Sequence, residues 1–218
     1  MKTMKNTRKR QKMLTLALCL LTLFAVWTLL VAFVDVQTIG PQDSRVGLAT
    51  LNRFVHGRVG VCMPLYTVTD WLGIVPLATA LGFALLGLAQ WIGRESLRRV
   101  DRSLLVLGVF YLAVIAAFGA FELAAVNYRP ILIEGRLEVS YPSSTTLLAA
   151  CVMPTAVMQL RARIKKRFFR RAVLIAVTVF TAFMVIGRLL SGVHWISDII
   201  GGALLAAALV MLYAAFER

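Results

Sequence analysis

Long apolar segments alternate with short polar segments along the whole chain. The sequence is 60% hydrophobic with a mean hydropathy of +0.81, whereas soluble domains are about 45–50% apolar. Each apolar run is near the ~20 residues that a helix needs to cross a bilayer. The predicted fold is therefore an all-α integral membrane protein, a single membrane domain over residues 1–218 with six transmembrane helices. The predicted spans are residues 14–34, 71–92, 104–121, 144–160, 172–190 and 195–216.

Basic residues gather in the segments that six spans place on one side of the membrane. The chain has 24 Lys and Arg against 10 Asp and Glu, a net charge of +14. Eighteen of the 24 lie in residues 2–12, 94–102 and 161–171 and at Arg218. The positive-inside rule then places both termini in the cytoplasm. Topology and contacts with anionic membrane lipids account for this charge, so no nucleic-acid partner is expected. The expected location is a bacterial plasma membrane.

Two segments on the predicted outer side have a structure of their own. Ser44 is a candidate N-cap for an amphipathic helix that ends at Gly57 and lies on the membrane surface. Residues 131–139 alternate weakly around Glu134-Gly135, which predicts a short hairpin. Ser143 or Ser144 then precedes an apolar run as a candidate N-cap. A helix N-terminus with free backbone N–H groups is a ready anion site.

Three ionisable residues lie together at the join between the last two predicted spans. A charge at the membrane edge is costly, so a functional role is expected for Arg188, His194 and Asp198. His194 and Asp198 are four residues apart, so on a helix they share a face and can hydrogen-bond. A carboxylate on one imidazole nitrogen exposes the other nitrogen as a nucleophile or base. Because Arg188 offers a fork of donors suited to phosphate oxygens, the group points to phosphoryl transfer.

Two further outer elements converge on this group. Arg129 follows the third span, and the turn at residues 143–145 begins the fourth. Two arginines and a helix N-terminus would bind a phosphate in front of His194. No metal is expected, since the arginines supply positive charge and no metal-ligating cluster is apparent. The alternatives are that either arginine is only an anchor or loop residue, and that Asp198 is a first-turn acid, a role compatible with catalysis.

The arrangement resembles the type-2 phosphatidic acid phosphatase superfamily. Members of that family are six-helix membrane phosphatases with three motifs in outer loops: K-x6-R-P, P-S-G-H and S-R-x5-H-x3-D. The positions that match are Arg129, Pro130, Pro142, Ser143, Arg188, His194 and Asp198. The positions that depart are Glu122 in place of Lys, Ser144 in place of Gly, Thr145 in place of His, and Gly187 in place of Ser.

The resemblance implies roles for the matching residues. His194 would attack phosphorus and form a phosphohistidine, with Asp198 orienting it and no cofactor required. Arg129, Arg188 and the Ser143-Ser144 region would hold the phosphate oxygens of an amphiphilic lipid phosphate at the outer face. The family's second-motif His protonates the leaving group, and Thr145 stands in its place.

The missing acid changes the expected substrate. A leaving alkoxide is strongly basic and needs a proton, whereas a leaving phosphate with a second pKa of about 6 hardly does. The substitution therefore favours a polyprenyl diphosphate or a related lipid phosphate. One alternative is a catalytically impaired member that binds or transports a phospholipid headgroup. Another is that Glu122, desolvated near lipid, is protonated and serves as the acid, although a solvated loop residue is the plainer interpretation, as a helix cap is for Thr145.

Overall fold

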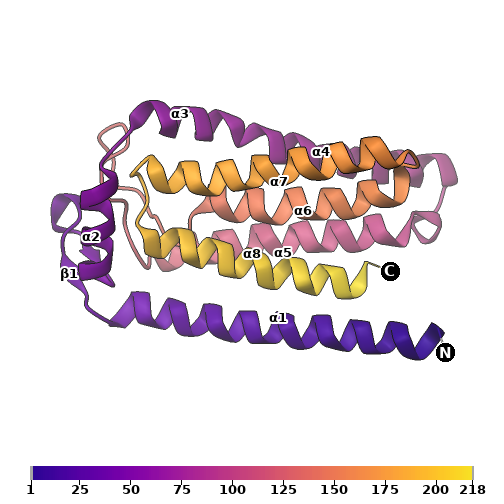
Figure 1. Ribbon diagram of the computed structural model, residues 1–218, viewed down its shortest axis with the longest axis horizontal. Helices are drawn as coiled ribbons and strands as arrows, with labels where there is room; N and C mark the ends of the chain where they lie inside the picture. Colours follow the sequence, from indigo (N-terminus) through magenta and orange to yellow (C-terminus); the bar gives the residue numbers. More distant parts are fainter. Residues whose placement is uncertain (1, 218) are drawn as a thin grey trace.

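The computed structural model describes residues 2–217, and Arg218 lies outside the described residues. Within these described residues, seven α-helices run along one common direction and an eighth crosses one end of the bundle (Figure 1). The lengthwise helices are α1 (Lys2–Phe33), α3 (Met63–Leu72), α4 (Ile74–Arg94), α5 (Arg102–Ala124), α6 (Ser144–Arg163), α7 (Arg167–Leu190) and α8 (Ile196–Phe216). The crossing helix is α2 (Ala49–Val59). The all-α prediction is confirmed.

Five helical stretches within residues 2–217 are long and apolar enough to cross a membrane. They are Asn6–Phe33, Met63–Arg94, Arg102–Ala124, Arg167–Leu190 and Ile196–Phe216. The predicted fourth span coincides with α6, which is helical but is not among the five because it carries Ser, Thr, Gln and Arg side chains. Helix α6 packs against α4, α5, α7 and α8, so protein covers its polar groups.

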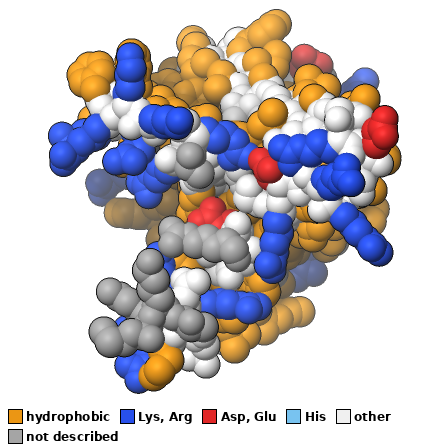
Figure 2. All heavy atoms as spheres, turned by 90° about the vertical axis from the view of Figure 1, so that its right-hand side faces the viewer, with side chains coloured by type: hydrophobic (Ala, Val, Ile, Leu, Met, Phe, Trp, Pro, Cys, Tyr) orange, Lys and Arg blue, Asp and Glu red, His pale blue; other side chains and the backbone are white. Residues whose placement is uncertain are grey.

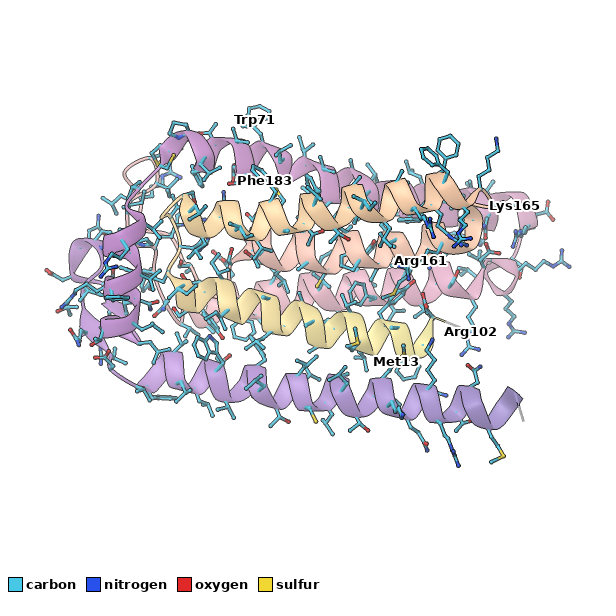
Figure 3. All side chains as sticks on the ribbon, in the orientation of Figure 1. Met13, Trp71, Arg102, Arg161, Lys165 and Phe183 are labelled. Carbon is cyan, nitrogen blue, oxygen red and sulfur yellow. The ribbon has the colours of Figure 1, made fainter. Side chains whose placement is uncertain are left out.

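The two ends of the bundle differ in charge. Both chain termini lie at one end (Figure 1), and Lys and Arg side chains dominate that face (Figure 2). Arg102, Arg161 and Lys165 lie there (Figure 3), as does the 3-10 helix η2 (Leu97–Arg99) between α4 and α5. The opposite end holds α2, the loop before α6 and the turn that joins α7 to α8 (Figure 1). The predicted catalytic residues therefore lie at the end of the bundle away from the basic face.

The predicted start of the surface helix is wrong. Ser44 follows a 3-10 turn, η1 (Pro41–Asp43), and the next residues form strand β2 (Arg45–Val46), which pairs with β1 (Gln37–Thr38). Because these residues are extended, α2 begins only at Ala49 and continues to Val59. Gly60 ends it with a φ of 68°, a conformation that glycine adopts without strain, so Gly57 lies inside the helix.

A close approach between α8 and the loop before α6 positions the site. A Cβ atom on Gly201 of α8 would lie 2.5 Å from the Tyr141 ring, so only glycine admits Tyr141 here. The Tyr141 hydroxyl also lies 2.7 Å from the Thr28 hydroxyl of α1, and its ring stacks on Phe24. Tyr141 is thus clamped between α1 and α8, and the neighbouring residues of its loop are held over the first turn of α8.

Candidate active site

His194 lies in the turn between α7 and α8 and is buried. The segment that follows α2 pins this turn: Cys62 N–H donates to the Ser191 carbonyl at 3.0 Å. Gly192 has a φ of 68°, and a Cβ there would lie 1.9 Å from the Gly60 carbonyl oxygen. The His56 ring lies 3.1 Å from the Gly192 carbonyl, so His56 supports the turn from outside. The imidazole of His194 is therefore held on a fixed backbone.

The direct His194–Asp198 hydrogen bond expected from their spacing is not formed. His194 precedes α8, and its Nδ1 lies 3.8 Å from Asp198 Oδ2, beyond hydrogen-bond distance. The Ser140 hydroxyl lies between them, 3.0 Å from His194 Nδ1, and it donates to Asp198 Oδ2. Asp198 therefore reaches the imidazole through a serine.

Asp198 is fully buried and accepts several hydrogen bonds at once. The Trp195 N–H donates to Oδ2 at 3.0 Å, which makes Asp198 part of the capping box of α8. The Asn127 amide and the Ser197 hydroxyl donate to Oδ1 at 3.3 and 3.4 Å. Both oxygens of the carboxylate are therefore engaged by donors within the protein. The predicted helix-capping role of Asp198 and its link to His194 therefore coexist in the structure.

A hairpin-like loop carries Asn127, Arg129 and Ser140 to the site. Ser140 N–H donates to the Asn127 carbonyl at 2.8 Å, and Arg129 N–H to the Glu138 carbonyl at 3.0 Å. Ile133 pairs with Arg136 across a turn at Glu134-Gly135, where both residues have positive φ. The predicted turn is confirmed, and it forms isolated bridges instead of full strands. This pairing sets Ser140 and Arg129 on the same side of the bundle as His194.

Both predicted phosphate-binding arginines are buried, and each is paired with a more exposed carboxylate. Arg129 Nε lies 3.0 Å from Glu138 Oε2. Arg188 Nη2 lies 3.1 Å from Asp70 Oδ1, its Nη1 lies 3.3 Å from the Thr69 hydroxyl, and its guanidinium stacks over the Tyr66 ring. Helix α3 thus fixes the direction of Arg188. A buried guanidinium is costly unless it is paired. Each carboxylate engages only some of the N–H donors of its arginine, so other donors of each guanidinium stay available.

Three predicted site residues present buried nitrogen atoms that have no hydrogen-bond partner within residues 2–217. They are Arg129 Nη1, Arg188 Nε and His194 Nε2. Unsatisfied buried polar atoms typically cost about 1–3 kcal/mol each, so native proteins retain few of them. Two cationic donors beside a bare imidazole nitrogen are suited to an anion with several acceptor oxygens.

Ser143 is the N-cap of α6, as predicted, and its hydroxyl accepts from Thr146 N–H at 3.5 Å. Its own N–H donates to the Asp198 carbonyl at 3.1 Å. The side chain and the N–H of Ser143 are therefore both engaged within the protein, and Ser143 joins α6 to α8. Ser144 instead lines a small pocket together with His194.

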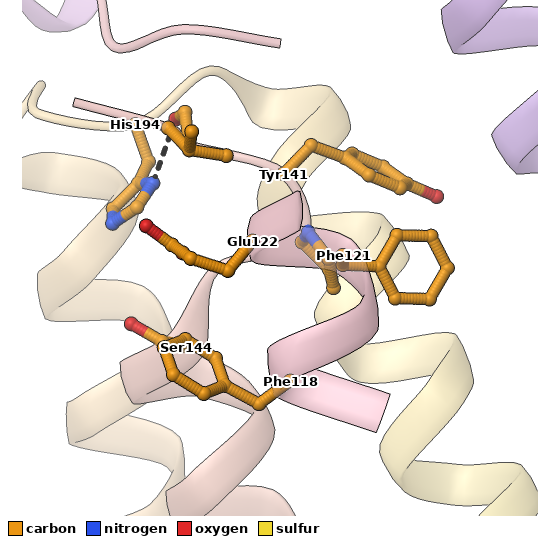
Figure 4. A pocket seen from close by; sticks show the side chains of 9 residues that line it. Phe118, Phe121, Glu122, Tyr141, Ser144 and His194 are labelled. Atoms are coloured by element: carbon orange, nitrogen blue, oxygen red, sulfur yellow. Dashed lines mark hydrogen bonds between the residues drawn. The ribbon is translucent and has the colours of Figure 1, made fainter. Parts of the chain in front are cut away.

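Glu122 and Thr145, two of the positions that depart from the motifs, lie on different walls. Glu122 lines the small pocket, where its carboxyl group faces His194 and Ser144 (Figure 4). This pocket has a volume of about 10 Å³, the room of about one water molecule. Thr145 lines a larger cavity of about 550 Å³ between α3, α4, α5 and α6. Ser144 and Phe118 line both spaces, so the two adjoin.

Burial lowers the pKa of His194 from its ordinary 6.5 to about 4. Desolvation is the largest cause because it penalises the charged imidazolium. Asp198 opposes this shift, whereas Arg129 and Arg188 lower the pKa further by repulsion. Both guanidinium groups are thus near enough to act on the imidazole. The ring is neutral at pH 7, and neutral imidazole is the form that carries a lone pair.

We expect the His194 imidazole to stay neutral from pH 8 down to pH 5, because protonation would bury an unsolvated cation beside two arginines. Histidine-labelled protein in detergent micelles, followed by NMR, measures this directly. The chain has two histidines, and a His56→Gln variant leaves His194 as the single imidazole signal. A midpoint near 6.5 in that variant would contradict the burial argument.

No group of three or more His, Cys, Asp or Glu side chains within the described residues is placed to hold a metal ion. The positive charge around His194 in residues 2–217 comes from Arg129 and Arg188.

Residues 120–218, which include every residue of this site from Glu122 to Asp198, match the PAP2 superfamily. The resemblance to this superfamily is confirmed. The fold agrees over a longer stretch: a transmembrane PAP2 type phosphatidylglycerolphosphate phosphatase from Bacillus subtilis superposes with a TM-score of 0.63. The alignment covers 92% of this chain and 94% of that chain at 19% identity. No curated protein matches the sequence.

The PAP2 motifs omit two residues that the structure places at the site. Ser140 bridges His194 and Asp198, and Asn127 donates to the same carboxylate. Ser140 lies two residues before Pro142 of the second motif, and Asn127 two residues before Arg129 of the first. Side chains two residues apart in an extended segment point to the same face of that segment. The spacing of Ser140 from Pro142 and of Asn127 from Arg129 was therefore the signal in the sequence that could have identified Ser140 and Asn127.

Proposed function

We propose that this PAP2 protein is a membrane lipid phosphatase that hydrolyses a polyprenyl diphosphate or a related lipid phosphate through a phosphohistidine on His194. One observation carries the proposal: Arg129 Nη1, Arg188 Nε and His194 Nε2 are buried and have no hydrogen-bond partner among residues 2–217. Two donors and one lone pair match the needs of a phosphoryl group, whose oxygens accept hydrogen bonds while its phosphorus accepts a nucleophile.

In the first step, His194 Nε2 attacks phosphorus and forms a P–N bond. The bond from phosphorus to the leaving oxygen breaks, and that oxygen takes the electron pair. Arg129 and Arg188 offset the charge on the remaining phosphoryl oxygens. The imidazole becomes cationic, and the Asp198 carboxylate stabilises it through Ser140. In the second step, water attacks phosphorus, the P–N bond breaks, and inorganic phosphate and neutral His194 are restored.

The larger cavity supports an amphiphilic substrate. Apolar side chains such as Ile74, Leu77 and Ile115 make up most of its lining, and at about 550 Å³ it has the volume of a typical ligand site. Because it adjoins the His194 pocket, a chain in the cavity would place its phosphate end toward His194. The small pocket must widen to admit a phosphoryl group, and Glu122 and Phe118 are the exposed side chains on its wall.

The difference in charge between the two ends of the bundle supports one orientation of the protein in the membrane. The basic end carries both termini, and the His194 end lies opposite (Figures 1 and 2). The positive-inside rule assigns the basic end to the cytoplasm. With α6 as the sixth crossing, the site then faces the outer leaflet of a bacterial plasma membrane.

The decisive experiment compares phosphate release by purified protein from a polyprenyl diphosphate and from phosphatidate. Because Thr145 replaces the family's acid, we expect the diphosphate to turn over about 10²–10⁴-fold faster, the usual contribution of a general acid. Equal rates would contradict this preference and would indicate that Glu122, the acidic residue on the pocket wall, supplies the proton. A Glu122→Gln variant would then lose phosphatidate hydrolysis selectively.

A second candidate function is binding or transport of a phospholipid headgroup without catalysis. The paired arginines favour it, since they suit phosphate binding whether or not His194 reacts. Absence of phosphate release from both substrates, together with retained phosphate binding, would favour this function over hydrolysis.

A further inference from the structure

Ser140 occupies a position that no PAP2 motif describes. Its side chain is buried, and its hydroxyl oxygen lies 3.0 Å from His194 Nδ1. The same oxygen donates to Oδ2 of the buried Asp198 carboxylate. The backbone N–H of Ser140 donates a hydrogen bond to the Asn127 carbonyl. This hydrogen bond fixes the backbone that carries the Ser140 hydroxyl.

The proton count at Ser140 determines the tautomer of His194. A serine hydroxyl has one proton, and an ionised carboxylate can only accept. Since the Ser140 proton goes to Asp198, its oxygen must accept from His194. Nδ1 therefore carries the imidazole proton, and Nε2 carries the lone pair. Nε2 is also the ring nitrogen that has no partner within residues 2–217.

We propose that Ser140 is a positioning residue that holds His194 in the Nδ1–H tautomer and leaves the Nε2 lone pair free for a phosphoryl group. The consequence for catalysis rests on the proposed function, whereas the tautomer itself does not. Asp198 alone cannot do this in the observed geometry, because 3.8 Å separates it from Nδ1. As the imidazole becomes cationic, Ser140 transmits the stabilising effect of the carboxylate to the ring.

Nitrogen NMR of ¹⁵N-histidine-labelled protein in micelles tests the tautomer without any turnover. In the His56→Gln background, we expect the proton of His194 on Nδ1 and none on Nε2 at pH 7. A proton on Nε2 would overturn the proposal. This measurement stands even if the protein hydrolyses neither substrate, so a failed tautomer and a failed phosphatase activity are distinguishable.

Three variants separate positioning from simple packing. In Ser140→Ala, we expect kcat to fall roughly 10- to 100-fold, as for outer partners of functional histidines, while KM changes little. The His194 nitrogen shifts should also change. Ser140→Thr keeps a hydroxyl and should recover most of kcat and the wild-type shifts.

Ser197→Ala is the matched control, because Ser197 donates to the other oxygen of Asp198. It should leave the nitrogen shifts of His194 as in the wild type. Wild-type kcat and wild-type nitrogen shifts in Ser140→Ala would refute the positioning role. Equal shift changes in Ser140→Ala and Ser197→Ala would do the same, since both would then act only through Asp198. If Ser140→Ala fails to fold, the wild-type spectrum and Ser140→Thr still decide the question.

Discussion

Replacing His194 with alanine should lower kcat at least about 10⁴-fold, because the reaction loses its nucleophile. Arg129 and Arg188 remain in His194→Ala, so binding of a phosphate analogue such as vanadate should persist. Phosphate release from a polyprenyl diphosphate measures the first effect, and calorimetry with vanadate measures the second. Loss of turnover together with retained binding would assign chemistry to His194 and binding to the arginines.

The control for this variant is His56→Gln. His56 is the other histidine of the chain, and its ring contacts the Gly192 carbonyl outside the proposed phosphate site. We expect His56→Gln to stay within several-fold of wild-type turnover, since glutamine can keep that hydrogen bond. Turnover that survives in His194→Ala would exclude covalent catalysis by this residue.

Replacing Thr145 with histidine should raise phosphatidate hydrolysis by about 10²-fold or more, the lower range for a restored general acid. Thr145 lines the cavity proposed for the lipid tail, next to Ser144 on the pocket of His194. The leaving oxygen joins the phosphate to the tail, so its expected place is between these two spaces. Polyprenyl diphosphate hydrolysis should change far less, because a leaving phosphate needs little protonation.

Thr145→Asn is the matched comparison, since asparagine is polar but has no titratable proton. It should leave the ratio of diphosphate to phosphatidate rates near the wild-type ratio. The rates of both substrates are measured by phosphate release at pH 7. A rise of both rates by the same factor in Thr145→His would show that the imidazole acts on binding or folding, and would contradict proton donation to the leaving group.

Several features of the site were predictable because they depend on local chemistry. Ser143 caps α6 because a serine ahead of an apolar run satisfies a free backbone N–H, and that requirement is local. The Glu134-Gly135 turn is also local, since glycine takes a positive φ without strain. The helices follow from apolar runs of membrane length.

Other features depended on which segments pack together. Ser44 has a side chain suited to an N-cap, but the residues that follow it, Arg45–Val46, form a strand that pairs with Gln37–Thr38. The His194–Asp198 spacing predicted a shared helical face, yet α8 begins only after His194. The lower apolar content of α6 reflects its neighbours, since a helix surrounded by four others need not be apolar throughout.

The sequence by itself determined an all-α membrane fold, the segregation of basic residues, and the identity of the residues that match the PAP2 motifs. These depend on composition, periodicity and spacing, which are properties of the unfolded chain as well. Only the tertiary structure decided that Ser140 lies between His194 and Asp198, that Arg188 is held by α3, and that Thr145 faces the apolar cavity. The first two features are contacts between residues that are far apart in the sequence, and the third is the direction of one side chain. All three depend on how the helices pack against one another in three dimensions.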